Sequence, residues 1–105
     1  MALIAQINVS ASGDNAIVAG QTGKKIRVKG YAITNGAATA NSVKWRSGTT
    51  DIAGPFYSAA ALGPIVVHDL APAGEFYFET QAGQALNLNL SAATAVGGSV
   101  QYSLE

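Results

Sequence analysis

The chain has 105 residues, a length that suits one domain, and we predict a single domain over residues 1–105. Six basic and six acidic side chains cancel to a net charge of zero, which gives no general attraction to nucleic acid or to an anionic membrane. Cysteine is absent, so disulfides, thiolate zinc sites and thiol nucleophiles are excluded. Only 11% of the residues are charged, which favours an oligomer or a subunit of a larger assembly.

The first half of the chain predicts short strands separated by turn residues. The expected strands of this half are residues 2–9, 16–19, 26–34 and 43–46. Segment 1–10 fits either a first strand or a terminal arm that reaches a neighbouring subunit. Asp14 and Asn15 indicate a turn in which a short polar side chain bonds to nearby backbone. Trp45 shares its side of a strand with Val43, which predicts a buried ring.

The second half continues the same pattern of strands and turns. The expected strands are residues 51–57, 65–68, 75–79, 84–91 and 99–102. Residues 58–62 are the only helix candidate, because three alanines there favour a single helical turn. Alternation predicts Phe76 and Phe78 in the core and Tyr77 outside. The whole pattern predicts an all-β fold, a jelly-roll-like β-sandwich of about eight or nine short antiparallel strands.

A ladder of alternating leucine and asparagine is the most regular part of the sequence. Leucines at positions 86, 88 and 90 alternate with Asn87 and Asn89, and a glycine pair at 97–98 indicates a turn into the segment that ends at Tyr102. We expect the two segments to pair, with the leucines in the core. Asn87 and Asn89, with Tyr102 on the facing strand, then form a candidate contact surface, because asparagine is disfavoured in strands.

No group of residues has the spacing of a catalytic, cofactor or metal site. His68 and Asp69 are neighbours on a strand and so point to opposite faces, which prevents Asp69 from orienting His68 as a base. One histidine with scattered acids offers no metal-ligand pattern. Residues 20–25 contain Gly and Lys but run into a strand and lack the phosphate-loop spacing. We therefore predict no enzyme activity, no cofactor and no metal.

The basic residues are confined to positions 24–46, whereas the acids are scattered. Among them, Arg27, Lys29, Lys44 and Arg46 are candidates for ion pairs with acidic groups on a partner subunit. The alternative is a single-stranded nucleic-acid surface in which Tyr31 and Trp45 stack bases. Equal numbers of acids and bases disfavour that alternative.

Two tyrosines define a second candidate surface. Tyr57 and Tyr77 could stack on sugar rings, as aromatic residues do in carbohydrate-binding modules. The competing interpretation is an interface role, since tyrosine is apolar along its ring and polar at its tip.

Three stretches of the sequence resemble short all-β virion proteins of tailed bacteriophages and prophages. They are GKKIRVKGY (residues 23–31), VKWRSGTTDIAGP (residues 43–55) and ETQAGQALNLNLS with AVGGSVQY (residues 79–91 and 95–102). The likeness covers about positions 23–104. It lies in the style and order of the segments, and residues 2–9 fall outside it.

Within this group the chain is most similar to head decoration, or cement, proteins. The resemblance implies a small homo-oligomer, a trimer or a dimer, that binds the major capsid protein on the outer surface of the head. It implies a virion location after assembly in the host cytoplasm, and the lack of a signal peptide or an apolar span agrees with cytoplasmic synthesis and no membrane partner. The alternative is a tail or fibre-tip module that binds a cell-surface glycan.

Overall fold

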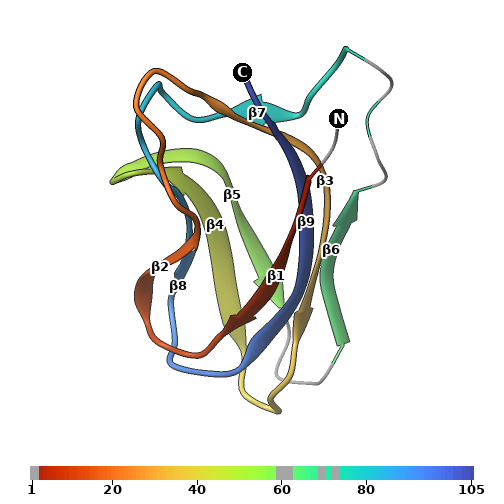
Figure 1. Cartoon of the computed structure of the whole chain (residues 1–105). Coiled ribbons are helices and arrows are strands. Elements are labelled where there is room, and N and C mark those ends of the chain that lie inside the picture. The colour runs from red at the N-terminus through yellow and green to blue at the C-terminus, as the bar shows by residue number, and fades with distance from the viewer. Residues whose placement is uncertain (1–2, 59–62, 69–70, 72–73) are drawn as a thin grey trace.

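The computed structural model describes residues 3–58, 63–68, 71 and 74–105, and strands dominate them (Figure 1). The strands of the described residues, in chain order, are β1 (Leu3–Val9), β2 (Gly13–Val18), β3 (Ile26–Asn35), β4 (Asn41–Ser47), β5 (Thr50–Ser58), β6 (Gly63–His68), β7 (Phe78–Glu79), β8 (Leu86–Leu90) and β9 (Val96–Leu104). Within the described residues no helix is long and apolar enough to cross a membrane. The predicted all-β class is confirmed. Residues 59–62 of the predicted helical turn lie outside the described residues.

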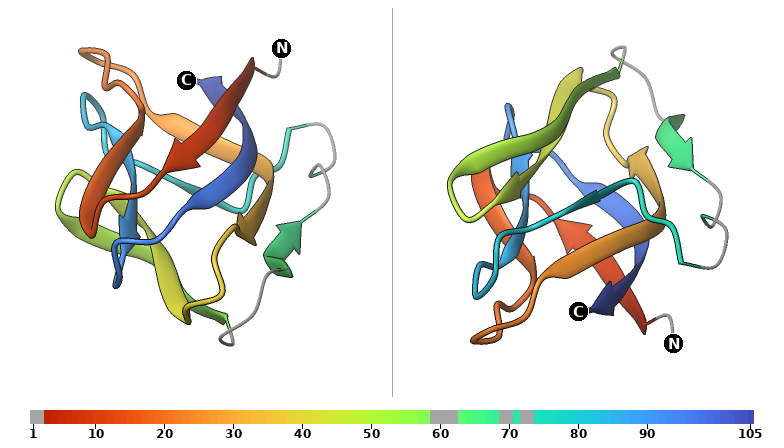
Figure 2. Two further views of the ribbon diagram at one scale, coloured as in Figure 1. Left: turned by 90° about the horizontal axis from the view of Figure 1, so that it is seen from below. Right: turned by 90° about the horizontal axis from the view of Figure 1, so that it is seen from above.

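The strands form two antiparallel sheets that lie face to face (Figures 1 and 2). The β9 sheet has the strand order β1-β9-β3-β6, and β7 pairs with β3 beside this path. The β8 sheet has the order β2-β8-β4-β5. Alternation along each strand directs apolar residues to the space between the sheets and leaves one outer face on each sheet.

The core fills the space between the two sheets. Trp45 of β4 is fully buried, as predicted, and its ring meets that of Tyr31 on β3 nearly edge-on, with centroids 5.6 Å apart. The three ladder leucines of β8 are at most 1% exposed and are core residues, as predicted. Full burial of one such side chain contributes about 1.5–3 kcal/mol. Burial between the sheets therefore outweighs any single surface ion pair.

Strand pairing is nested along the chain. The pairs β4–β5, β3–β6, β2–β8 and β1–β9 enclose one another in sequence, and all are antiparallel. The chain thus forms a long antiparallel ribbon that doubles back on itself. Leu3 pairs with Tyr102, so the first and last described strands lie side by side.

The predicted pairing of the leucine–asparagine ladder with the last strand is wrong. β8 pairs with β2 and β4, whereas β9 pairs with β1 and β3 in the opposite sheet. Gly97 and Gly98 lie inside β9 and do not form the expected turn. The placement of β8 and β9 in opposite sheets has a packing reason, because Val96 and Val100 of β9 then face the core from the side opposite the β8 leucines.

Two local expectations also differ from the structure. β2 begins at Gly13, so Asp14 lies in a strand opposite Asn89 and not in a turn. Asn15 still bonds nearby backbone as expected, since its Nδ2 donates to the Ala11 carbonyl at 2.8 Å. The predicted strand at 75–79 is reduced to Phe78–Glu79, and Phe76 is consequently 37% exposed instead of buried.

Candidate functional site

The outer face of the β8 sheet carries most of the polar residues predicted as contacts. We call this surface the charged face, and its residues are Asp14, Lys44, Arg46, Asp51, Asn87 and Asn89. Strand register places them in two rows. Asp14, Asn89 and Lys44 lie side by side on β2, β8 and β4. Asn87, Arg46 and Asp51 form the next row on β8, β4 and β5.

Arg46 is the centre of a network on the charged face. Its Nη1 lies 3.1 Å from both carboxylate oxygens of Asp14, and its Nε lies 3.0 Å from Oδ1 of Asp51. It also donates to the carbonyl of Thr49. Lys44 Nζ lies 3.2 Å from Oδ2 of Asp51. Both predicted cations of this face therefore have carboxylate partners within their own chain.

The two ladder asparagines also bond within the chain. Asn89 Nδ2 donates to Oδ1 of Asp14 at 2.8 Å, and Asn87 Nδ2 donates to the carbonyl of Gly48 at 2.8 Å. The asparagines thus have a structural reason to occupy a strand. They hold β2 and the β4–β5 turn against β8.

Arg27, Lys29 and Tyr102 lie on the β9 sheet and do not join the asparagines in one surface. Arg27 Nε lies 2.9 Å from Oε2 of Glu79, and its guanidinium carbon lies 4.6 Å above the centre of the Phe76 ring. Lys29 Nζ donates to the carbonyl of Glu75 at 2.5 Å. Tyr102 is half-buried and packs against the core.

Charge on the β9 sheet gathers at the end where β3 meets β7. The hydrogen bond from Arg27 is the main cause that holds the pKa of the Glu79 carboxyl below its ordinary value. Burial opposes it, and the nearby charges of Lys25 and Arg27 act in the same direction as the hydrogen bond. Lys25 Nζ lies 3.5 Å from Oε1 of Glu79, and Arg27 Nη1 lies 3.9 Å from Oε1 of Glu105. This end is a compensated ion-pair cluster.

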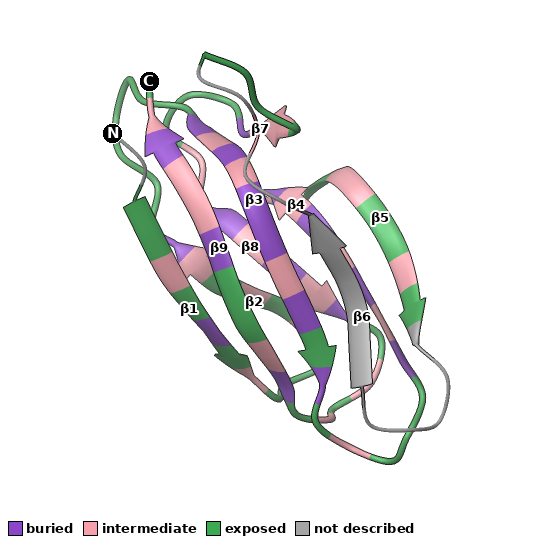
Figure 3. Cartoon of the chain, turned by 90° about the vertical axis from the view of Figure 1, so that its right-hand side faces the viewer, coloured by how far each residue is buried: buried purple, intermediate pink, exposed green. Residues whose placement is uncertain are grey.

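Apart from this end and Lys29 at the β3 bulge, the outer face of the β9 sheet carries no charged side chain on the described strands β1, β9 and β3. We call it the neutral face, and it consists of Ile4, Gln6 and Asn8 of β1, Gly97, Ser99 and Gln101 of β9, and Gly30, Ala32 and Thr34 of β3. Register aligns them in three rows across the strands (Figure 3). Most of the side chains are small, and Ile4 is 69% exposed. No residue pattern in the sequence points to this surface.

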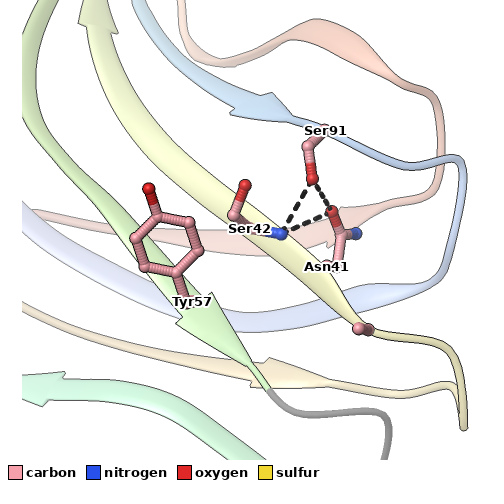
Figure 4. A pocket seen from close by; sticks show the side chains of 5 residues that line it. Asn41, Ser42, Tyr57 and Ser91 are labelled. Atoms are coloured by element: carbon pink, nitrogen blue, oxygen red, sulfur yellow. Dashed lines mark hydrogen bonds between the residues drawn. The ribbon is translucent and has the colours of Figure 1, made fainter.

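Tyr57 lines a shallow pocket of about 230 Å³ together with Ala40, Asn41, Ser42 and Ser91 (Figure 4). The ring of Tyr57 is 77% exposed. Asn41 is buried and holds the pocket wall, because its Oδ1 accepts from the Ser42 and Ala92 amides and from the Ser91 hydroxyl. The hydroxyls of Ser42 and Tyr57 also lie beside the opening (Figure 4).

Tyr77 does not line the pocket with Tyr57. Its ring packs nearly edge-on against Tyr31 at a centroid distance of 6.4 Å, and it is 44% exposed. Burial, with a smaller contribution from Tyr77, raises the pKa of the Tyr31 phenol to about 12. Tyr57 thus lies at the open pocket, and Tyr77 lies against Tyr31.

Within the described residues no three carboxylate or imidazole side chains gather as metal ligands. The side chain of His68, and the whole of Asp69, lie outside the described part of the chain. The described side chains show ion pairs between strands and no nucleophile held against a base.

Comparison with protein-family models, with curated proteins and with solved structures found no match to this chain. The features of the structure that bear on function are the two outer faces and the open pocket.

Proposed function

We propose that the protein is a structural virion component, a decoration protein that binds the outside of a phage head and stabilises contacts between major capsid proteins. The resemblance in segments 23–31, 43–55 and 79–102 supports this class of protein. The neutral face is the observation that carries the proposal, because an uncharged strand surface can be covered by another protein without leaving a charge desolvated.

We further infer that the sandwich is a jelly roll. The support is the nested pairing of β1–β9, β2–β8, β3–β6 and β4–β5, in which β7 is a short addition before β8. A jelly roll is a doubled antiparallel ribbon of eight strands and is common in capsid and lectin domains. It would give the protein a rigid surface without an active site.

The proposed mechanism needs only a rigid binding surface and many symmetry-related copies of the protein on the shell. Packaged genome pushes the capsid subunits apart, and a rigid module placed across their seam resists the separation by burying surface on both. The neutral face would cover the coat proteins, while the charged face, whose ion pairs are made within the chain, would remain in solvent. Each contact is small, but symmetry repeats it over the whole shell, and linked contacts add strongly to the total binding.

Binding to heads tests the proposal. Undecorated heads of the phage that encodes the chain are mixed with purified protein and sedimented, and the bound protein is measured against concentration. Wild type should bind saturably at a fixed number of copies per head. Ser99→Lys, on the neutral face, should weaken binding about tenfold or more, because the new charge would be desolvated. No binding of wild type, or cryo-electron microscopy density at a tail tip alone, would refute the head assignment.

Ala16→Lys is the matched control for Ser99→Lys. Both positions are exposed and lie on strands, but Ala16 lies on the charged face opposite Asn87. We expect binding of Ala16→Lys within about twofold of wild type. If Ala16→Lys abolished binding and Ser99→Lys did not, the coat would contact the charged face, where Lys44, Arg46, Asn87 and Asn89 lie.

A glycan-binding tail or fibre-tip module is the second candidate, and the Tyr57 pocket is the observation that favours it. An exposed ring beside hydroxyl groups suits stacking on a sugar ring. Binding would be measured by nuclear magnetic resonance titration with host surface oligosaccharides. Saturable shifts centred on residues 40–42, 57 and 91 that Tyr57→Ala removes would support this function over head decoration. Absence of shifts would exclude the pocket as its site.

A further inference from the structure

The four outer strands of the two sheets differ in how well they are protected against pairing with another strand. β1 and β6 end the β9 sheet, and β2 and β5 end the β8 sheet. An outer strand exposes alternate backbone N–H and C=O groups, and proteins normally block them with charge, proline or a bulge. Three of the four strands carry such a block.

The blocked strands each combine an irregular register with a disfavoured residue. β5 contains Pro55 and shifts register twice against β4. β6 contains Pro64 and shifts register against β3. β2 contains the charged Asp14 and shifts register against β8 after Ala16.

β1 has none of these protections. Its sequence, LIAQINV, contains no charge and no proline, and its seven residues pair with β9 without a register shift from Leu3 to Val9. At the same time Leu3 and Ile4 are 38% and 69% exposed, the only exposed large aliphatic side chains among the described residues. β1 is therefore a straight, uncharged template for one more strand (Figure 3).

We infer that β1 is the homodimer interface, where it pairs antiparallel with β1 of a second copy across a two-fold axis at Gln6. This register is the one in which all seven residues overlap. It places Leu3 opposite Val9 and Ala5 opposite Ile7 of the second copy, on the core side. On the outer side it places Ile4 opposite Asn8, and the two Gln6 amides face each other.

A second copy fits β1 better than an unrelated strand does, because β1 is complementary to itself. A two-fold axis brings each residue near its own counterpart, which is costly when that residue is charged, and β1 has no charge. Antiparallel pairing within one sheet also keeps both neutral faces on the same side. The dimer would present one continuous neutral surface of twice the width. This wider surface bears on head decoration only if the proposed function holds.

Solution mass tests the inference without any phage component. Light scattering coupled to size-exclusion chromatography should give wild type twice the 10.6 kDa mass of the chain. Gln6→Lys and Gln6→Glu should each raise the dimer dissociation constant about tenfold or more, because like charges meet at the axis. An equal mixture of the two variants should form a heterodimer.

Ser99→Lys is the control for charge alone, since Ser99 lies directly beside Gln6 on β9 and on the same face. It should remain dimeric, and circular dichroism should show all variants folded. A monomeric wild type up to millimolar concentration, a trimer, or a mixture of Gln6→Lys and Gln6→Glu that stays monomeric would overturn the inference. A wild-type monomer that still binds heads would refute the dimer alone, and a dimer that ignores heads would refute the decoration function alone.

Discussion

The two outer faces of this molecule are built from the same strand geometry and satisfy their polar groups in opposite ways. On the charged face, Arg46 of β4 pairs with Asp14 of β2 and with Asp51 of β5. On the neutral face the described hydrogen bonds of the side chains are few, with Thr34 Oγ1 lying 3.3 Å from the Gly97 carbonyl. A face that pairs its own charges needs no partner, whereas an uncharged face next to an unprotected strand is suited to being covered.

The β9 sheet depends on close backbone contact between β9 and β3. We expect the largest loss of stability from a substitution at Gly98, where that contact is tightest. At Gly98, φ is +141°, and an added Cβ would lie 1.9 Å from the carbonyl oxygen of Ala32 on the adjacent strand. Gly98→Ala must therefore strain the backbone or separate β9 from β3. We expect a loss of about 3 kcal/mol or more in the free energy of unfolding, measured by urea denaturation.

The neighbouring glycine provides the control for Gly98→Ala. A Cβ at Gly97 would meet the Ile7 carbonyl oxygen at 3.6 Å, an ordinary contact distance. Gly97→Ala should therefore change the free energy of unfolding by less than about 1 kcal/mol. Equal effects of the two substitutions would show that β9 and β3 do not approach as closely as described.

The interior between the two faces can be tested separately through Tyr31. Its pKa is raised to about 12, so the folded protein keeps the phenol proton after the unfolded chain, which titrates near 10, has lost it. The stabilisation is complete below pH 10 and is lost as the pH rises towards 12. This loss amounts to about 2–3 kcal/mol at 1.36 kcal/mol per pKa unit.

Tyr31→Phe retains the ring contacts between the sheets and removes the titrating group. Free energies of unfolding would be measured at intervals from pH 8 to the highest pH at which the chain remains intact. Wild type should lose stability above pH 10 more steeply than Tyr31→Phe does. Parallel curves for the two proteins would mean that the Tyr31 phenol is not shielded from solvent.

The strands and the core were largely predictable, because a two-residue period is a local property of the sequence. It correctly placed Trp45 and the leucines of β8 inside. It says which residues share a face but not which strands are neighbours. The pairing of β8 with β9 was wrong for this reason, and the failure at Phe76 arose because the strand assumed there is only two residues long.

The two faces differed in how far sequence could predict them. Arg46, Lys44 and the asparagines were recognised as outward residues. Their partner Asp14 comes from a strand distant in the sequence and Asp51 from the next strand of the β4–β5 hairpin, and both contacts depend on the register. The neutral face lacks any distinctive residue type. It becomes visible only when positions 4–8, 30–34 and 97–101 are known to be adjacent.

Salt should change the effect of a substitution on the free energy of unfolding when the residue lies on the charged face, but not when it lies on the neutral face. Arg46→Met removes the cation shared by Asp14 and Asp51, and we expect a loss of about 1 kcal/mol at low ionic strength, because exposed pairs contribute little individually and a network somewhat more. The loss should shrink in 1 M NaCl, measured by urea denaturation at both salt concentrations.

Ser99→Ala on the neutral face is the comparison for Arg46→Met. Its effect should stay within about 0.5 kcal/mol and should not change with salt. A loss for Arg46→Met that is independent of salt would instead indicate that the Arg46 side chain stabilises the sheet by packing.

The smallest effect is expected at Glu79, where the β9 sheet ceases to be neutral. Because the Arg27 hydrogen bond lowers the Glu79 pKa, the ionised carboxylate stabilises the fold at pH values above its ordinary pKa of 4.5. That contribution is lost as the pH falls through the lowered value. Glu79→Gln should therefore be less stable than wild type at pH 7, and the difference should narrow as the pH is lowered below 4.5.

Glu75→Gln is the matched control for Glu79→Gln, since none of the ion pairs found among the described residues involves the Glu75 side chain. Its stability relative to wild type should stay nearly constant between pH 7 and pH 3. A constant deficit for Glu79→Gln would mean that Arg27 is held by Phe76 and not by the carboxylate. The charge of Arg27 would then be available to a partner, and the end where β3 meets β7 would become a candidate contact surface beside the neutral face.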